Sequence, residues 1–545
     1  MAIVSLNKKI FEKEIGKLDG KMEEKIAIFG TPIDGQNDEE IQIEVFPNRP
    51  DMLSYHGFKR AFLAYLGKDK GIKIYKINKP EKDYIVKIDS SVKPIRPYTA
   101  CAIVKGLNLD DTKIKEIIEL QEKLHMTIGR KRKKMAIGIY PLETIKLPIE
   151  FKAVEPDKIK FIPLESDRVM SGFEILQKHP TGKEYAHLLA GKSKFPIFVD
   201  AKGEVLSMPP IINSQLTGRV TNETKNVFVE CSGFDFEIQK KCLNIIVTSL
   251  AEMGGSIYQM EIKYSKKEIT PDLSSEKMKI SIDNTNKILG TSMKEKDIQK
   301  YLESMGYNYS NAKVEIPPWS TDILHEVDLI EDIAIAYGYN NFEPVIPDIS
   351  TIGHEDQRWI LKKRVSEILT GLGLIEVSNY YLTSKQDQIQ KMGLNEKEGK
   401  NQIELKESKT DYNVLRQNLT HYLLKNLSEN VDVEYPHKIF EIGRVFDKDL
   451  KETEKLSIAL SPSNFTQVKE IIDYISKMIG TKIKVVEAKN FPAHFIEGRA
   501  GKITIGNESI GYVGEVHPKI LKEWKIKMPV SLLEISLEEI FKNLM

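Results

Sequence analysis

Five carboxylates lie within eleven residues, from Asp322 to Asp332, directly ahead of an apolar stretch. If residues 326–337 form a helix, Asp328, Glu331 and Asp332 fall at positions i, i+3 and i+4 and share one face. Like charges at this spacing repel, and a cation or the basic residues of a partner offset that repulsion. Carboxylate oxygens without cysteines are the ligands of a hard ion such as Mg²⁺. The pattern predicts either a magnesium site or a solvated acidic helix face that favours the helix dipole.

Apolar spacing indicates the elements that position these residues. Pro317 and Pro318 force an extended entry to helix 326–337. Asp51 or Ser54 is expected to cap a helix at 55–66. Further helices are expected from 283, at 243–252, 294–305, 361–372 and 415–427, and strands at 41–45, 227–231, 377–382 and 438–446.

The bulk composition bounds the class of protein. At 545 residues the chain is too long for one core, and about three to five domains are expected. We place them at 1–82, 83–267, 268–347 and 348–545. A net charge of +1 excludes a polycation that coats nucleic acid. Three cysteines without metal spacing and the absence of a long apolar run lead us to expect a cytoplasmic protein.

No self-contained catalytic motif is readable. Gly191-Lys192-Ser193 suggests a phosphate-binding loop, but Ala186 stands where that loop needs a glycine. The sequence also lacks a Gly-x-Ser-x-Gly elbow and a His-Glu-x-x-His pair. The chain therefore lacks an obvious self-contained catalytic site, although its size is typical of an enzyme.

Several segments together resemble, in order along nearly the whole chain, the β subunits of phenylalanyl-tRNA synthetases (phenylalanine–tRNA ligases). The resemblance is to their shorter archaeal and eukaryotic type. The segments are Phe46-Pro47-Asn48-Arg49-Pro50-Asp51-Met52-Leu53-Ser54, Arg130–Gly138, His179–His187, Met208–Ser214, Pro318–Tyr339, Leu415–Leu419, Phe440–Phe446 and Tyr512–Pro518.

The resemblance implies an α+β multidomain fold. Its expected parts are a small N-terminal α/β domain, a mixed α/β editing domain, a small helical, winged-helix-like domain, and a class II synthetase-like antiparallel-sheet module without catalytic motifs. A class II site needs Arg-x-Glu, whose arginine holds the ATP α-phosphate, and here Ile439 precedes Phe440-Glu441. We interpret Arg416 and Arg444 as structural or interface residues.

Adenylation of phenylalanine with ATP is then expected on a separate α subunit, in an α₂β₂ heterotetramer that acts on tRNA(Phe). In this family the residues that match Asp322, Asp328, Glu331 and Asp332 bind Mg²⁺ jointly with the α subunit. The resemblance therefore favours a structural or interface ion, and it leaves Glu326 as a helix-start residue.

The second block resembles the domain that hydrolyses tyrosine wrongly attached to tRNA(Phe). A pocket shaped for phenylalanine rejects one added hydroxyl only modestly, whereas a second site that hydrogen-bonds the hydroxyl adds discrimination. Alternation puts Phe228, Glu230 and Ser232 on one face, as an aromatic wall with two polar contacts. Further candidates are Ser207, Asn213, Ser214 and Thr217, although each of these polar side chains can also serve a turn or cap.

The sequence does not reveal a side chain that would carry out the hydrolysis. No Ser–His or Cys–His arrangement is readable, so we expect positioned water and the ribose hydroxyl of the tRNA to act. Relatives often read Gly-x-His-Asp where this chain has Gly138-Ile139-Tyr140-Pro141, so no role of that histidine carries over.

Two questions stay open at this point. The basic run Arg130–Lys134 predicts either a solvated loop or phosphate contacts to the tRNA acceptor end. The alternatives to a ligase subunit are a freestanding trans-editing aminoacyl-tRNA hydrolase and a non-catalytic RNA-binding scaffold. Helix 361–372 and the degenerate module resemble interface elements and favour the subunit.

Overall fold

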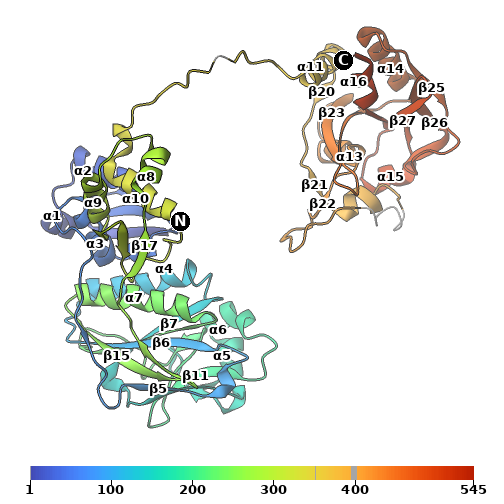
Figure 1. Ribbon diagram of the computed structural model, residues 1–545. Coiled ribbons are helices and arrows are strands. Elements are labelled where there is room, and N and C mark those ends of the chain that lie inside the picture. Colours follow the sequence, from blue (N-terminus) through green and yellow to red (C-terminus); the bar gives the residue numbers. More distant parts are fainter. Residues whose placement is uncertain (1, 350, 395–401, 545) are drawn as a thin grey trace. The chain divides into compact units, whose positions relative to one another are not determined.

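The computed structural model describes residues 2–349, 351–394 and 402–544. The chain forms two compact units, Met1–Ile346 and Pro347–Met545 (Figure 1). Each unit has its own sheets and its own hydrophobic core. The mixture of helices and strands agrees with the expected α+β multidomain class. Among the helices of these described ranges, none has both the length and the apolar character needed to cross a membrane.

The first unit begins with a small antiparallel sheet in the order β1-β3-β2. Its elements are β1 (Ala2–Asn7), α1 (Lys8–Glu14), α2 (Gly20–Ile28), β2 (Ile33–Gln36), β3 (Glu40–Val45) and α3 (Tyr55–Tyr65). Ile41, Ile43 and Val45 are buried, as the period of two predicts. Ser54 Oγ accepts a hydrogen bond of 3.0 Å from the backbone N–H of Gly57, which confirms the predicted cap.

A larger sheet follows, with nine strands in the order β13-β12-β11-β8-β5-β15-β6-β14-β7 and two further strands, β4 and β16, paired with β15. Its strands are β4 (Ile77–Asn78), β5 (Ile85–Ile88), β6 (Tyr98–Lys105), β7 (Met135–Pro141), β8 (Ile149–Val154), β11 (Phe195–Val199), β12 (Val205–Met208), β13 (Ile212–Asn213), β14 (Val227–Gly233), β15 (Ser256–Lys263) and β16 (Lys267–Thr270).

Alternation along the strands sends side chains to two separate cores. Helices α4 (Asp111–Met126) and α7 (Phe236–Glu252) pack with Ala102, Ile137 and Val229 on one face of the sheet (Figure 1). The other face carries Tyr140 and Phe228 in a second core. The short elements β9 (Lys160–Phe161), β10 (Met170–Ser171), α5 (Gly172–Lys178) and α6 (Pro180–Tyr185) lie between β8 and β11 in the chain.

The last part of the first unit combines three helices with a small antiparallel sheet in the order β17-β19-β18. Its elements are β17 (Glu276–Lys279), α8 (Ile282–Leu289), α9 (Glu295–Ser304), β18 (Asn308–Ser310), β19 (Lys313–Ile316) and α10 (Glu326–Tyr337). The three helices confirm the sequence predictions for this segment.

One hydrophobic core runs through all three parts of the first unit. Helix α3 contributes Phe58 and Phe62, α7 contributes Leu243 and Leu250, and α10 contributes Ile333. The finer division at 1–82, 83–267 and 268–347 stays a prediction.

The second unit is built on a seven-stranded sheet in the order β20-β23-β24-β28-β27-β26-β25, antiparallel except between β20 and β23. Its elements are α11 (Gln357–Gly371), β20 (Ile375–Glu376), β21 (Leu382–Thr383), β22 (Val414–Leu415), α13 (Thr420–Glu429), β23 (His437–Phe446), β24 (Glu452–Ser461), α14 (Phe465–Ile479), β25 (Ile483–Glu487), β26 (Phe495–Ile505), β27 (Glu508–Val516), α15 (Pro518–Glu523), β28 (Ser531–Ser536) and α16 (Glu538–Leu544).

Helices cover both faces of this sheet. Val365 of α11 and Val468 of α14 pack with Leu456 and Leu533 on one face. On the other face, Leu423 of α13 and Leu521 of α15 pack with sheet residues such as Leu532.

Two sequence predictions in this unit were wrong. The strand expected at 377–382 is broken, because the backbone N–H of Asn379 donates to the Glu441 side chain at 3.3 Å instead of to a strand carbonyl. The helix expected at 415–427 begins only at Thr420. Glu534 Oε2 accepts from the N–H groups of Leu419 and Thr420, at 2.6 and 3.2 Å, and so caps the helix there from another strand.

Candidate functional site

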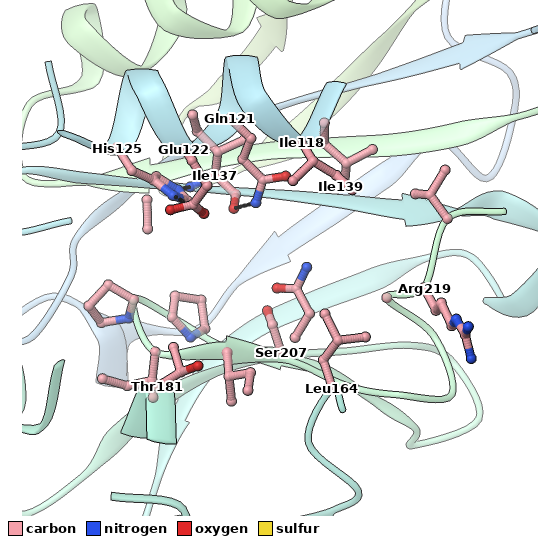
Figure 2. Close-up of a pocket in the computed structure, with 18 of the residues that line it drawn as sticks. Ile118, Gln121, Glu122, His125, Ile137, Ile139, Leu164, Thr181, Ser207 and Arg219 are labelled. Carbon is pink, nitrogen blue, oxygen red and sulfur yellow. Dashed lines mark hydrogen bonds and ion pairs between the residues drawn. The ribbon is translucent and has the colours of Figure 1, made fainter. Parts of the chain in front are cut away.

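A cavity of about 530 Å³ lies in the first unit, between α4 with β7 on one side and the segment after β12 on the other. Figure 2 shows Gln121, Ile118 and Ile139 facing Ser207 and Leu164 across it. The helix wall follows from sequence spacing, because positions i, i+3, i+4, i+7 and i+11 of a helix share one face. On α4 these are Ile114, Ile117, Ile118, Gln121 and His125, and all of them line the cavity.

Three of the seven predicted pocket residues come together in this cavity. Ser207, Asn213 and Glu230 line it, from β12, β13 and β14. Ser207 and Asn213 are direct partners in the β12–β13 pairing, so the hairpin holds them side by side. The cavity lining therefore combines isoleucines, Gln121 and His125 of α4 with a hydroxyl, an amide and a carboxyl group from the strands.

The other four predicted residues do not line this cavity. Ser214 Oγ accepts from the N–H of Leu216 at 3.3 Å, and Thr217 Oγ1 donates to the carbonyl of Val205 at 3.2 Å. Phe228 stacks on Tyr140, with ring centroids 5.7 Å apart, and Ser232 Oγ accepts from Arg96 Nε at 3.1 Å. Their contacts hold the turn and the strand that carry the lining residues.

Glu230 is the most perturbed group of the cavity wall. It is 1% exposed, and burial raises its pKa to about 8, although the charge of the buried Arg96 acts in the opposite direction. Its Oε1 lies 3.3 Å from the hydroxyl of Tyr140, whereas Oε2 has no hydrogen-bond partner in the structure. An unpaired oxygen on a buried carboxyl group carries a free-energy cost, and Glu230 is one of the residues that line the cavity.

Sequence reasoning missed a polar cluster at one end of the cavity. His125 Nε2 accepts from the N–H of Ile137 at 2.8 Å, so its other nitrogen, Nδ1, carries the hydrogen and donates to Glu122 Oε1 at 3.1 Å. Arg132 donates to Glu122 Oε1 and to the carbonyl of Ile211, at 2.9 Å each, and its guanidinium lies over the ring of Tyr185. Of these residues, only His125 could have been indicated by helical spacing, because it lies at i+11 from Ile114 on α4, whereas Arg132 lies beyond the helix.

The basic run is thus divided in two. Arg132 is tied into the cavity wall, whereas Arg130, Lys131, Lys133 and Lys134 are exposed. Arg130, Lys131 and Arg132 all have positive φ, at 47°, 55° and 61°, a conformation that costs non-glycine residues on the order of 1 kcal/mol each. Backbone bonds from Lys134 to Gly129 and from Arg132 to His125 hold this tight loop.

Four of the five carboxylates lie on α10, as predicted, and Asp322 precedes the helix. Glu326 is the first residue of the helix and accepts from Ser281 N–H and Asn284 Nδ2, at 2.5 and 2.8 Å. Asp328 accepts from the N–H groups of Leu324 and His325, at 2.8 and 2.7 Å, as the reciprocal member of a capping box.

The four predicted metal ligands have different surroundings. Asp332 is buried, accepts a hydrogen bond from the hydroxyl of Tyr307, and has its pKa raised by burial to about 6, against the charge of Arg49. Asp322 and Glu331 are exposed. Over the described residues no group of three or more His, Cys, Asp or Glu side chains is placed to hold a metal ion. As arranged, these carboxylates do not form a complete ligand set.

In the second unit, Ile439 stands at the position of the class II arginine, and the glutamate two residues later pairs with an arginine from another segment. Glu441 Oε1 accepts from Arg416 Nη1 at 2.6 Å, and both residues are at most 2% exposed. Arg416 also donates to the carbonyls of Arg444 and Asn379. Its guanidinium is committed to the interior, which supports the structural interpretation of Arg416.

Comparison with known proteins supplies the family. One family model, described as the tRNA synthetase B5 domain, matches residues 278–339, and another, the phenylalanyl tRNA synthetase beta chain CLM domain, matches 343–537. The phenylalanine–tRNA ligase beta subunit of Thermococcus sibiricus is 39% identical over 512 residues, which cover 91% of this chain and 90% of that protein. This chain belongs to the phenylalanine–tRNA ligase beta subunit family. The beta subunit of Archaeoglobus fulgidus is 36% identical and covers 99% of both chains.

A solved structure agrees with this family. The N-terminal fragment of the phenylalanyl-tRNA synthetase beta subunit from Pyrococcus horikoshii aligns with a TM-score of 0.59 and 37% identity, over 62% of this chain and 99% of the fragment. The family inferred from the sequence motifs, and its archaeal type, are confirmed. As a beta subunit of phenylalanine–tRNA ligase, the chain is part of an aminoacyl-tRNA ligase.

Proposed function

We propose that this beta subunit hydrolyses tyrosine from wrongly charged tRNA(Phe), in the cavity between α4 and β12. The observation that carries the proposal is the unpaired Oε2 of buried Glu230 in the cavity wall. A buried polar group without a partner is costly, and a ligand hydroxyl would satisfy it. Ile114, Ile117 and Ile118 of α4, which line the same cavity, suit the ring of an aromatic amino acid.

The expected reaction is hydrolysis of an ester. Water attacks the ester carbonyl carbon, the bond from that carbon to the ribose oxygen breaks, and a proton passes to the ribose oxygen. Among the described lining residues, His125 is poorly suited as a general base, because both ring nitrogens are engaged with Ile137 and Glu122. We therefore assign binding and positioning to the protein, and proton transfer to water and the ribose hydroxyl.

We further propose that adenylation takes place on a partner α subunit in an α₂β₂ complex that uses ATP and Mg²⁺. Ile439 supports this, because it stands where a class II site needs the arginine that clamps the phosphate, and Arg416 is committed to Glu441. Asp322 and Glu331, which are exposed, are the carboxylates best placed to meet an ion at a partner's surface. Asp328 and Asp332 remain proposed ligands, although each already accepts hydrogen bonds within the chain. A cytoplasmic location fits this function.

The test is to purify the chain alone and with an α subunit, and to assay Phe-tRNA formation and Tyr-tRNA(Phe) hydrolysis. We expect the complex to charge tRNA and to remove tyrosine, and Glu230→Ala to reduce tyrosine removal while charging is unchanged. Glu204→Ala, at an exposed position outside the cavity, is the matched control.

Other results would select another function. Charging by the isolated chain would contradict the assignment of adenylation to the α subunit. Tyrosine removal at full rate without an α subunit would indicate a freestanding hydrolase. A complex that charges tRNA but releases no tyrosine, with or without the substitution, would indicate a non-catalytic scaffold.

A further inference from the structure

Tyr140 does not line the cavity, but its hydroxyl contacts two residues that do. The side chain is fully buried on β7, and its hydroxyl oxygen lies 2.8 Å from Ser207 Oγ and 3.3 Å from Glu230 Oε1. Ser207 and Glu230 belong to strands at distant places in the sheet order, β12 and β14. Tyr140 is therefore the link that fixes one polar group of the cavity relative to the other.

Gly138 makes this link possible. In the β7–β14 pairing, Tyr140 lies opposite Phe228, and Gly138 lies opposite Glu230. The tyrosine side chain runs back along its own strand, so that a Cβ at position 138 would lie 2.0 Å from its hydroxyl oxygen. Glycine is thus required for the space it leaves, and the pair Gly138-x-Tyr140 acts as one structural feature.

The donors and acceptors of Tyr140, Ser207 and Glu230 determine which hydrogen bonds a ligand can still make. A tyrosine hydroxyl has one hydrogen to donate and lone pairs to accept, so it can engage Ser207 and Glu230 Oε1 together. Glu230 Oε2 then stays without a partner. A hydroxyl group on a ligand complements Ser207 and Glu230, because it can donate a hydrogen bond to one of them and accept one from the other.

We propose that Tyr140, in the space left by Gly138, is the positioning residue that orients Ser207 and Glu230 to select an amino-acid side chain bearing a hydroxyl over one without it. This inference rests on the proposed editing function and adds the residues that set its specificity. Tyr140 itself does not touch the substrate, since it lies behind the cavity wall.

The test compares Tyr140→Phe and Gly138→Ala with wild type in the complex with the α subunit. Tyr258→Phe is the matched control, because Tyr258 is a tyrosine of the same sheet outside the cavity. We expect Tyr140→Phe to lower kcat/KM for Tyr-tRNA(Phe) hydrolysis by about 10- to 100-fold, the effect of losing one positioned buried hydrogen bond. Hydrolysis of Phe-tRNA(Phe) should change by less than about twofold. Gly138→Ala should reproduce this pattern.

A direct binding measurement distinguishes the proposed editing function from the positioning role of Tyr140. L-tyrosine amide and L-phenylalanine amide are titrated against the complex by calorimetry, where the wild type should prefer the tyrosine amide and Tyr140→Phe should lose that preference. If wild type fails to hydrolyse Tyr-tRNA(Phe) but shows this difference in binding, the editing function is wrong and the positioning role stands. If the variant hydrolyses both substrates with an unchanged ratio, or loses both equally together with thermal stability, the positioning role is overturned.

Discussion

Arg416 Nη1 lies 2.6 Å from Glu441 Oε1 in a part of the second unit where both side chains are almost fully buried. Glu441 also accepts from Asn379 Nδ2 at 2.8 Å, and Arg416 also donates to the carbonyl of Arg444 at 2.8 Å. The pair therefore ties three chain segments together. A side chain of Cβ or larger at Gly443 would meet Arg416 Nη2 at 2.4 Å, so the neighbouring strand is shaped around the arginine.

Breaking this pair should be costly. Arg416→Met leaves the Glu441 carboxylate buried without its cation, and we expect a loss of about 3–5 kcal/mol in the free energy of unfolding. Chemical denaturation of the full chain measures it. Arg416→Met with Glu441→Leu should recover part of the loss, because no unpaired charge is left behind. A loss below about 1 kcal/mol for the single variant would contradict a structural role.

The raised pKa of Glu230 predicts a pH dependence of stability. The folded pKa is about 8 and the ordinary value is 4.5, so between these values the folded state holds more protons than the unfolded state. The contribution of Glu230 to stability is then greatest below pH 4.5 and is lost as the pH rises from 4.5 to 8, by at most about 1.4 kcal/mol per pH unit. Denaturation of wild type and Glu230→Gln across pH 5–9 checks this. The glutamine variant should lack this slope, and Glu204→Gln should retain it.

Substitutions in the two parts of the basic run should have different effects on tRNA affinity and on its dependence on salt. Replacing exposed Arg130, Lys131, Lys133 and Lys134 by alanine should weaken binding at low salt and reduce its dependence on salt concentration, if they contact phosphates. Arg132→Ala should leave that dependence almost unchanged, because Arg132 bonds Glu122 and Ile211. Filter binding over a salt series decides between the two. An unchanged salt slope in the fourfold variant would leave the solvated loop as the correct interpretation.

Measurements of Mg²⁺ affinity and of stability should distinguish the roles of the carboxylates in α10 and just before it. In the complex with the α subunit, Asp322→Asn and Glu331→Gln should weaken Mg²⁺ binding and leave stability unchanged, because both side chains are exposed. Asp328→Ala should weaken Mg²⁺ binding and also cost about 1 kcal/mol of stability through loss of the cap. Calorimetric titration with Mg²⁺ and thermal unfolding give the two readouts. Unchanged affinity in all three variants would refute the shared metal site.

Local signals predicted much of the fold correctly. Period-two alternation located β3, the Ser54 cap located α3, and the apolar spacing after Glu326 located α10. The errors arose where a distant side chain decides the backbone. Glu534 fixes where α13 begins, and Glu441 breaks the strand at Asn379. Neither contact leaves a trace in the sequence near the affected element.

In the candidate site, too, contacts between distant residues could not be predicted from the local sequence. Alternation placed Glu230 on the same strand face as Phe228 and Ser232, but it could not say that Glu230 reaches the cavity while Ser232 bonds Arg96. Tyr140 was noticed only as a departure from relatives, because its role depends on strand pairing and on the space at Gly138. Residue type predicted the chemistry of the wall, and tertiary packing decided which residues form it.

The core that α3, α7 and α10 share in the first unit limits how such a protein can be cut and recombined. Since α3, α7 and α10 bury their apolar faces in common, removal of residues 1–82 or of 268–346 would expose the helix that supports the sheet of the cavity. In the described part of the chain, the boundary near residue 346 crosses no such core, and the Pyrococcus horikoshii fragment aligns with 62% of this chain. If the proposed editing function holds, the first unit should therefore be exchanged between proteins or lost as a whole, because smaller pieces of it would expose part of the shared core.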